Sequence, residues 1–172
     1  TGLGYTETLG VPELRQAISD HYRATGGLEI DPETIMVTTG SSGGFLLAFL
    51  AAFDAGDRVA LASPGYPAYR NIMAALGIEA VDLASDLADR FQPTPALLDA
   101  AIEKGGKLDG LLIASPANPT GTMLDHDALS VLVDYCKARD IRIISDEVYH
   151  GITYGAPAET ICGHTLTRAT EF

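Results

Sequence analysis

The sequence predicts an α/β fold, namely a mostly parallel sheet with helices on both faces in a three-layer αβα arrangement. Two observations predict it. Short apolar runs end in polar or glycine-rich turns, and the last run, Ile141–Ile144, holds three β-branched isoleucines in four residues. That pattern is typical of a strand buried on both faces, as in parallel sheets. Segments of helical periodicity separate the runs, which favours strands joined by crossover helices.

Size and charge limit the classes of function. With 172 residues, 47% of them hydrophobic, the chain can bury a core and suits one domain or most of one. Its 11 basic and 23 acidic residues give a net charge of -12, which repels phosphate backbones and anionic lipid surfaces. No apolar run approaches the roughly 18 residues of a membrane span. We therefore expect neither a nucleic-acid partner nor a membrane partner.

The two cysteines indicate no special chemistry. Cys136 and Cys162 lie in different segments, without histidine or cysteine neighbours at metal-ligand spacing. This arrangement predicts neither a disulfide framework nor a metal site, and a reducing, cytoplasmic setting is the expectation.

The first elements are a loop and a helix. Residues 1–10 are glycine-rich and polar, and Pro12 suits the first turn of a helix predicted over Pro12–Thr25. Leu14 and Ile18 fall on one face of that helix, while Arg15 points elsewhere, so the helix is predicted to be amphipathic.

A candidate anion site follows. A short strand, Ile35–Thr39, is predicted to run into the turn Gly40–Gly44 and then into an apolar helix, Phe45–Phe53. Free N–H groups of the first helical turn and the positive end of the helix dipole would face a ligand there, which suits a phosphate. The segment is neither a dinucleotide fingerprint nor a P-loop, which would need a lysine. A capped helix after a tight turn explains the same residues equally well.

Alternating strands and helices fill the rest of the chain. The loop Ser63–Tyr69 contains two prolines and two tyrosines, and Asp125 is a plausible N-cap for the last helix. Residues 84–95 are polar and predicted to lie at the surface. The predicted strands are 58–63, 79–83 and 108–114, and the predicted helices are 69–76, 95–104 and 125–138.

Two strands end in residues that could carry chemistry. The run Ile141–Ile144 is followed by Asp146 and Tyr149, and the strand 108–114 is followed by Asn118. In open parallel sheets ligands bind outside the carboxyl ends of the strands, so a site is expected there. Asp146 taken alone could equally cap the next turn.

Five motifs in order give the chain a resemblance to a known family. They are Gly4-Tyr5 through Gly10, Thr39–Gly43, Ser63–Tyr69, Asn118-Pro-Thr-Gly121 and Ser145-Asp-Glu-Val-Tyr149. Together they cover essentially the whole chain, and they resemble the fold-type I pyridoxal-phosphate enzymes, specifically the class I/II aminotransferases. The resemblance implies pyridoxal 5'-phosphate as cofactor and the large domain of such an enzyme over residues 1–172.

The resemblance also implies roles for residues of this chain. Gly40, Ser41 and Ser42 would cradle the cofactor phosphate, and Tyr66 would stack on the pyridine ring, with Tyr69 as the competing candidate. Asp146 would face the ring nitrogen, while Asn118 and Tyr149 would hydrogen-bond the 3-oxygen. Tyr5 would reach the phosphate of the neighbouring subunit, so a homodimer is expected. The bonds Asn118–Pro119 and Ser63–Pro64 are predicted to be cis.

By the same resemblance the parent protein transfers an amino group between an amino acid and a 2-oxo acid. Such enzymes hold the cofactor through a Schiff-base lysine beyond the Asp-Glu-Val-Tyr motif, and no residue of this chain matches it: Lys104, Lys107 and Lys137 all lie upstream. We therefore expect a truncated large domain without its N-terminal arm, lysine segment and small C-terminal domain, which contains no catalytic residue and is inactive alone.

Other functions fit the same motifs. A β-elimination lyase or a cyclopropane-forming synthase of this fold would share all of them. The aminotransferase-like effector domain of a transcription regulator would bind the cofactor without turning it over, and an upstream winged-helix domain would identify it. A doubly wound module for another phosphate ligand explains the Gly40 turn but leaves Asn118, Asp146 and Tyr149 without a role.

Overall fold

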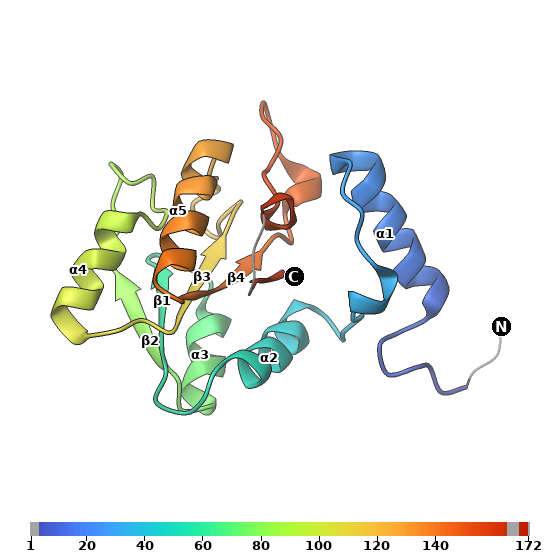
Figure 1. Cartoon of the computed structure of the whole chain (residues 1–172), viewed down its shortest axis with the longest axis horizontal. Coiled ribbons are helices and arrows are strands. Elements are labelled where there is room, and N and C mark those ends of the chain that lie inside the picture. The colour runs from blue at the N-terminus through green and yellow to red at the C-terminus, as the bar shows by residue number, and fades with distance from the viewer. Residues whose placement is uncertain (1–3, 165–168, 172) are drawn as a thin grey trace. The chain divides into compact units, whose positions relative to one another are not determined.

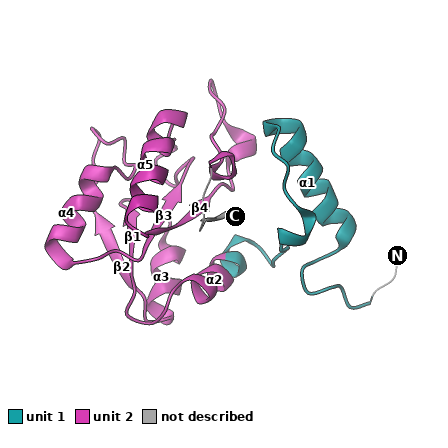
Figure 2. Ribbon diagram, in the orientation of Figure 1, with its two compact units in different colours: residues 1–44 teal, residues 45–172 magenta. Residues whose placement is uncertain are grey.

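The computed structural model describes residues 4–164 and 169–171 (Figure 1). The chain forms two compact units, residues 1–44 and residues 45–172, and each is described by itself (Figure 2). In the described part of the chain, no helix is both long enough and apolar enough to cross a membrane.

The larger unit contains a sheet of five parallel strands. The strands are β1 (Arg58–Ala62), β2 (Glu79–Leu83), β3 (Gly110–Ala114), β4 (Arg142–Asp146) and β5 (Ala169–Glu171). Their order across the sheet is β2-β1-β3-β4-β5, and every neighbouring pair is parallel. Because the strands run the same way, their carboxyl ends share one edge. The predicted α/β fold class is confirmed.

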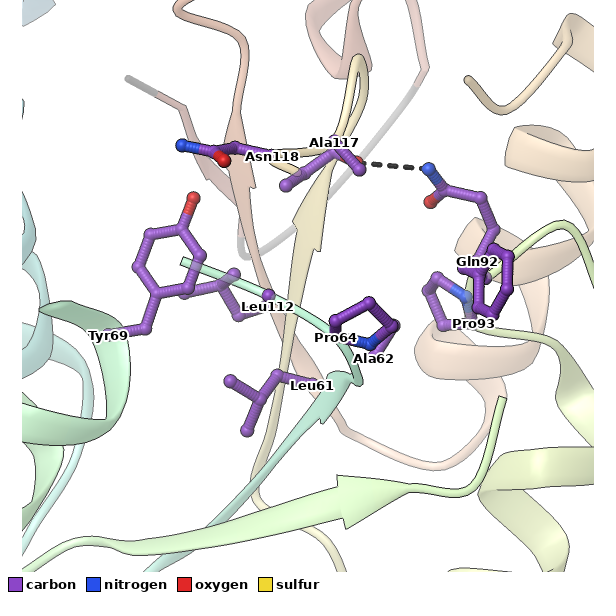
Figure 3. Close-up of a pocket in the computed structure, with 12 residues that line it drawn as sticks. Leu61, Ala62, Pro64, Tyr69, Gln92, Pro93, Leu112, Ala117 and Asn118 are labelled. Carbon is purple, nitrogen blue, oxygen red and sulfur yellow. Dashed lines mark hydrogen bonds between the residues drawn. The ribbon is translucent and has the colours of Figure 1, made fainter. Parts of the chain in front are cut away.

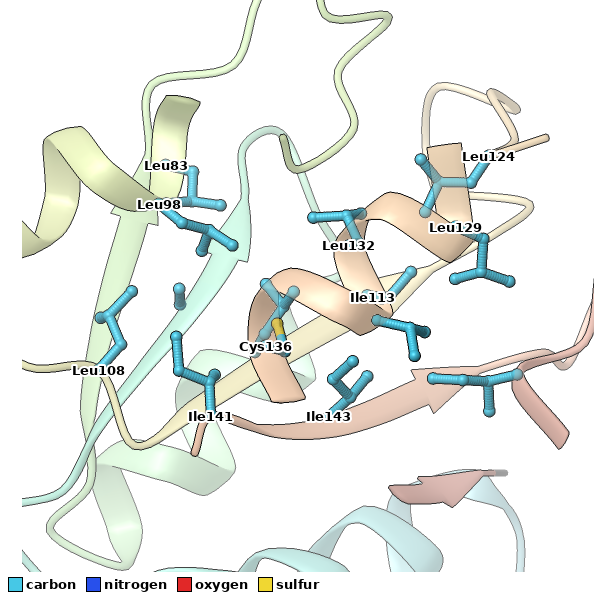
Figure 4. Packing of buried hydrophobic residues seen from close by; sticks show 14 residues of the cluster. Leu83, Leu98, Leu108, Ile113, Leu124, Leu129, Leu132, Cys136, Ile141 and Ile143 are labelled. Carbon is cyan, nitrogen blue, oxygen red and sulfur yellow. The ribbon is translucent and has the colours of Figure 1, made fainter. Parts of the chain in front are cut away.

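Helices cover both faces of this sheet. They are α2 (Ser41–Ala52), α3 (Pro67–Ala75), α4 (Pro95–Gly105) and α5 (His126–Ala138), with short 3-10 turns η2 (His150–Ile152) and η3 (Ile161–Gly163) after β4. The α4 and α5 helices pack on one face through Leu98, Leu132 and Cys136 (Figure 4). Phe45 and Phe49 of α2 and Met73 of α3 pack on the other.

Successive residues of each central strand point into opposite layers. In β3, Leu111 and Ile113 join the core beneath α4 and α5, whereas Leu112 joins the core beneath α2 and α3. Likewise Ile143 and Ile144 of β4 point to opposite faces. Burial on both faces is why these strands read as continuous apolar runs rather than alternating ones.

Local signals set the helix ends. Asp125 accepts a hydrogen bond from the Ala128 N–H at 2.9 Å, and Thr94 accepts one from the Leu97 N–H, so both act as N-caps. The predicted Asp125 cap is confirmed. Pro67 lies at the start of α3, two residues earlier than predicted, because proline is tolerated where the helix N–H has no partner.

The smaller unit differs from its prediction in two respects. It contains α1 (Pro12–Gly26) and the 3-10 turn η1 (Pro32–Thr34). Residues 35–39 form no strand, because the Val37 N–H is bonded to the Leu9 carbonyl oxygen at 2.9 Å rather than to a sheet. On α1, Leu14 is exposed and Arg15 is buried. The guanidinium of Arg15 contacts Glu33 Oε1 at 3.0 Å and Glu7 Oε2 at 3.4 Å, which offsets the cost of its burial.

Candidate active site

The candidate site lies at the carboxyl edge of the parallel sheet, where β4 ends in Asp146. This carboxylate is buried, with 7% of the residue exposed. Its Oδ1 accepts the Val148 N–H at 3.1 Å, and its Oδ2 accepts the hydroxyl of Tyr69. A buried carboxylate needs such donors because charge is costly to remove from water. Asp146 therefore does more than cap the following turn.

The resemblance makes Tyr69 the competing candidate for ring stacking, and the structure gives it another place. It lies in the first turn of α3 and is 3% exposed, with its ring edge-on to Phe45 at a centroid distance of 5.0 Å. Burial first, and then the hydrogen bond to Asp146, raise the pKa of the Tyr69 phenol well above its usual range. The phenol is therefore a fixed donor to Asp146 at neutral pH.

Tyr66 remains the accessible aromatic ring of this loop. It directly precedes α3, is 36% exposed, and stands edge-on to Tyr69 with ring centroids 5.5 Å apart. The Ser63–Pro64 bond before it is cis, as predicted. Tyr66 is thus the more exposed of the two tyrosines, and its stacking role stays a prediction.

Asn118 and Tyr149 border a common cavity of about 440 Å³. Asn118 comes from the loop after β3, and Tyr149 from the segment between β4 and η2. The Asn118–Pro119 bond is cis, as predicted, and so is Ser115–Pro116, which was not. The structure thus brings together two of the residues assigned to the same ring oxygen, although 31 positions separate them in the sequence.

A second, smaller cavity of about 20 Å³ lies beside Tyr69 and Asn118 and is also bordered by Gln92 (Figure 3). The Gln92 side chain is buried and donates hydrogen bonds to the carbonyl oxygens of Ala114 at 3.1 Å and Thr122 at 2.9 Å. Residues 84–95 were predicted to lie at the surface, and for Gln92 this is wrong. Its amide satisfies backbone groups at the end of β3, a role that polarity alone does not reveal.

No motif indicates a role for Glu147 and His150, although the predicted site residue Tyr149 lies between them. Glu147 is 7% exposed, and its carboxylate accepts from Ser145, Thr160 and the Ile161 N–H. A charged residue next to Asp146 in a buried strand end is a usable signal, since isolated buried carboxylates are rare.

The predicted phosphate turn belongs to the smaller unit. Gly40 has φ +85°, a left-handed conformation that favours glycine, and α2 begins at the next residue. Ser41 and Ser42 occupy the first turn of α2 and are exposed. The first N–H groups of a helix have no partner within the helix, so this turn could bind an anion, and that it does so stays a prediction. That it lies beside Asp146 stays a prediction.

The other residues named from the sequence have clear places. Tyr5 is fully exposed in the loop before α1. Lys104 and Lys107 lie in and after the last turn of α4, before β3 begins, and so belong to the amino edge of the sheet, away from Asp146. Lys107 is paired with Asp109 at 3.0 Å, and this contact raises the pKa of its ammonium. Neither lysine lies at the candidate site.

Comparison with known proteins shows the family to which this chain belongs. Residues 1–170 match the family described as aminotransferase class I and II. The chain belongs to this family. It is 52% identical over 166 residues to the valine--pyruvate aminotransferase of Mycobacterium tuberculosis, covering 96% of this chain and 42% of that protein.

Two further relatives widen the comparison. A crystal structure of an aminotransferase from Mycobacterium tuberculosis superposes with a TM-score of 0.91 at 50% identity, over 99% of this chain and 46% of that one. A 1-aminocyclopropane-1-carboxylate synthase of Prunus mume is 33% identical over 164 residues, covering 91% of this chain and 33% of that protein. The chain thus spans less than half the length of these relatives.

Proposed function

We propose that the protein containing this chain is a pyridoxal-phosphate-dependent aminotransferase, which moves an amino group between an amino acid and a 2-oxo acid. The observation that carries the proposal is the 52% identity to a valine--pyruvate aminotransferase. The relative that is a cyclopropane-forming synthase is 33% identical, so amino transfer is the better supported of the two reactions.

The donor set at Asp146 fits the cofactor. Each carboxylate oxygen accepts one hydrogen bond from the protein, from Val148 or Tyr69, and keeps a further lone pair for a ligand N–H. A protonated pyridine nitrogen supplies such an N–H with a positive charge, which a buried carboxylate favours. When bound, the cofactor withdraws the electrons left behind as the substrate Cα proton departs.

The remaining residues act by holding and orienting. Tyr66 would cover one face of the ring, and its exposed position after the Ser63–Pro64 bond supports this. Asn118 and Tyr149 would donate to the 3-oxygen and stabilise its ionised form. Gly40, Ser41 and Ser42 would bind the phosphate through N–H groups and hydroxyls, because the first turn of α2 presents donors to an anion.

Assembly and location complete the proposal. We propose a cytoplasmic homodimer in which Tyr5 of one subunit reaches the phosphate held by its partner. The exposed position of Tyr5 on the loop before α1 supports this. We further propose that residues 1–172 are the cofactor-binding large domain and that the catalytic lysine lies in the rest of the polypeptide. The chain alone then binds cofactor weakly and reversibly and has no transaminase activity.

Cofactor binding is tested by titrating the chain with pyridoxal phosphate and following absorbance. Asp146→Asn should weaken binding about tenfold or more, since a lost charge pair of this kind is worth at least about 1.4 kcal/mol. Asp125→Asn is the matched control, because it makes the same charge change at a helix cap and should leave affinity unchanged. Equal affinity of the Asp146 variant, or a borohydride-stable adduct on Lys104, Lys107 or Lys137, would contradict the site.

The reaction is tested on the full-length protein. With valine and pyruvate it should form alanine and the 2-oxo acid of valine, detected by chromatography of both products. Formation of a cyclopropane amino acid from an activated methionine derivative, without alanine formation, would decide for the synthase instead. Sedimentation of the same protein tests the homodimer, and a monomer at micromolar concentration would exclude it.

A further inference from the structure

Glu147 is a buried carboxylate to which the proposed chemistry gives no role. Its side chain is 4% exposed and turns back toward the strand it follows. Oε1 accepts the Ser145 hydroxyl at 3.0 Å and the Ile161 N–H at 2.8 Å, and Oε2 accepts the Thr160 hydroxyl at 2.8 Å. One carboxylate therefore ties the end of β4 to the segment that enters η3.

His150 extends this network to the neighbouring strand. Its Nδ1 lies 3.4 Å from Glu147 Oε2, and its Nε2 lies 2.8 Å from the carbonyl oxygen of Ser115. A carbonyl oxygen can only accept, so Nε2 carries a proton and donates. Ser115 directly follows β3, and its own N–H is bonded to the Asp146 carbonyl oxygen at 3.2 Å. The imidazole is thus a bridge between the carboxyl ends of β3 and β4.

The two residues assigned to the cofactor 3-oxygen lie close in the sequence to the residues of this bridge. Tyr149 lies between Glu147 and His150 in the sequence, and Asn118 follows Ser115 by three positions. Both residues border the same cavity. Their side chains come from different loops, and loops set such spacings poorly unless hydrogen bonds hold them.

We propose that Glu147 and His150 are positioning residues that fix Tyr149 and Asn118 relative to each other, and through them the ionisation of the cofactor 3-hydroxyl. The inference rests on the proposed function for its link to the cofactor. The hydrogen-bonded contacts of Glu147 and His150, called the clamp below, are a property of the cofactor-free chain. Buried polar networks are costly when partly satisfied, so removing one member disturbs the others. Neither residue needs to touch the cofactor.

Two variants of His150 distinguish the effect of its hydrogen bond to Ser115 from the effect of losing the imidazole ring. His150→Gln places an amide nitrogen near the position of Nε2 and can still donate to Ser115. His150→Asn places its amide near Nδ1 and cannot reach Ser115. His126→Asn is the control, because it removes a histidine that has no contact with Glu147, His150 or Ser115 in the described contacts.

The first measurement uses no cofactor. In amide NMR spectra of the chain, His150→Asn and Glu147→Gln should shift the Asn118 side-chain amide and the Tyr149 backbone amide. His150→Gln should leave both near their wild-type positions, and His126→Asn should not move them. Unshifted Asn118 and Tyr149 signals in folded His150→Asn would overturn the clamp.

The second measurement titrates the chain saturated with pyridoxal phosphate and follows the absorbance change of its 3-hydroxyl. His150→Asn should raise the pH of this change by about one unit, a tenfold change in the ionisation constant. His126→Asn should leave this titration at its wild-type position. An unmoved titration in His150→Asn would overturn the link to the 3-oxygen. If the wild-type chain binds no cofactor, the proposal that residues 1–172 bind it is overturned, while the NMR result still decides on the clamp.

Discussion

The buried contact between Tyr69 and Asp146 links a helix on one face of the sheet to the strand that carries the candidate site. The residues are 77 positions apart, and the donor is a phenol whose pKa is raised by burial. Tyr69 therefore holds one carboxylate oxygen in place before any ligand arrives. This is preorganisation by a neutral donor rather than by a charge.

Replacing Tyr69 tests the energetic weight of this contact. Tyr69→Phe should lower the free energy of unfolding by about 1–3 kcal/mol, because a buried carboxylate oxygen loses its donor. Tyr135→Phe is the control: its hydroxyl also donates to a carboxylate, Asp99 at 2.6 Å, but that pair is exposed, and the cost should stay below about 1 kcal/mol. Urea unfolding measures both, and equal costs would argue against a special role for Asp146.

Cys136 gives the protein a defined response to alkaline pH. Cys136 lies on the buried face of α5 and is 1% exposed, and burial raises the pKa of its thiol from 9.0 to about 12. The folded state thus favours the protonated thiol, so this contribution to stability is complete below pH 9 and is lost as the pH rises from 9 towards 12. The loss approaches about 1.4 kcal/mol per pH unit.

The variant Cys136→Ala isolates this effect, since alanine cannot ionise. The stability difference between wild type and Cys136→Ala should shrink by roughly 1 kcal/mol between pH 8 and pH 10. Urea unfolding at both pH values, with reductant present, measures it. A difference that stays constant with pH would mean that the thiol is not protected in the folded state.

At the scale of elements, local sequence signals predicted most of the fold. The strands β1 to β4 and the helices α3 to α5 were found within a turn of their true ends, because continuous apolar runs and helical periodicity both reflect burial. The segment 35–39 failed because its β-branched residues have strand propensity, but their backbone partner is Leu9. Propensity does not say where a hydrogen bond goes.

In the candidate site too, local patterns predicted some residues and missed the partners that hold them. Asp146, Asn118 and Tyr149 could be named because polar residues at strand ends stand out from apolar runs. The partners that hold them could not, since the bond from Tyr69 and the bridge from His150 to Ser115 span long stretches of sequence. Tertiary pairing decides these contacts, and no local pattern encodes it.

The loop before α4 holds two consecutive residues in the left-handed conformation, Arg90 with φ +54° and Phe91 with φ +55°. This conformation costs roughly 1–2 kcal/mol for a residue with a Cβ and little for glycine. Arg90 is exposed, so Arg90→Gly should raise the melting temperature, with a gain of about 0.5–1 kcal/mol.

The neighbouring variant Asp89→Gly provides the comparison. Asp89 does not have a positive φ, so glycine there only adds freedom to the unfolded chain and should destabilise by about 0.5–1 kcal/mol. Calorimetry of the two variants should therefore give shifts of opposite sign. Destabilisation by Arg90→Gly would mean that the Arg90 side chain makes contacts worth more than the strain.

At the scale of the whole molecule, the spacing between layers depends on one glycine. A Cβ on Gly110, at the start of β3, would overlap the ring of Phe53 and lie 3.3 Å from Val59 Cγ2. Because Phe53 closes the core under α2, the sheet and this helix layer can approach closely only if residue 110 lacks a side chain. Packed interiors adjust little to such overlap.

Gly110→Ala should therefore destabilise the protein by about 1–3 kcal/mol through overpacking. Phe53→Leu should destabilise it too, by leaving space. The double variant should be more stable than the sum of the two effects predicts, with a coupling of about 0.5–3 kcal/mol. Additive free energies from urea unfolding would show that the two residues do not meet.

The two edges of the parallel sheet differ in how well they should tolerate substitutions. Its amino edge is closed by short turns joined by backbone hydrogen bonds, such as Gly56 N–H to Gly77 O at 2.8 Å and Arg142 N–H to Asp109 O at 3.0 Å. Every loop that carries candidate chemistry in the larger unit leaves the opposite edge. Substitutions that change a reaction can therefore accumulate at the carboxyl edge, while the turns of the amino edge preserve folding. Proteins of this fold can thus differ in substrate and keep the same sheet.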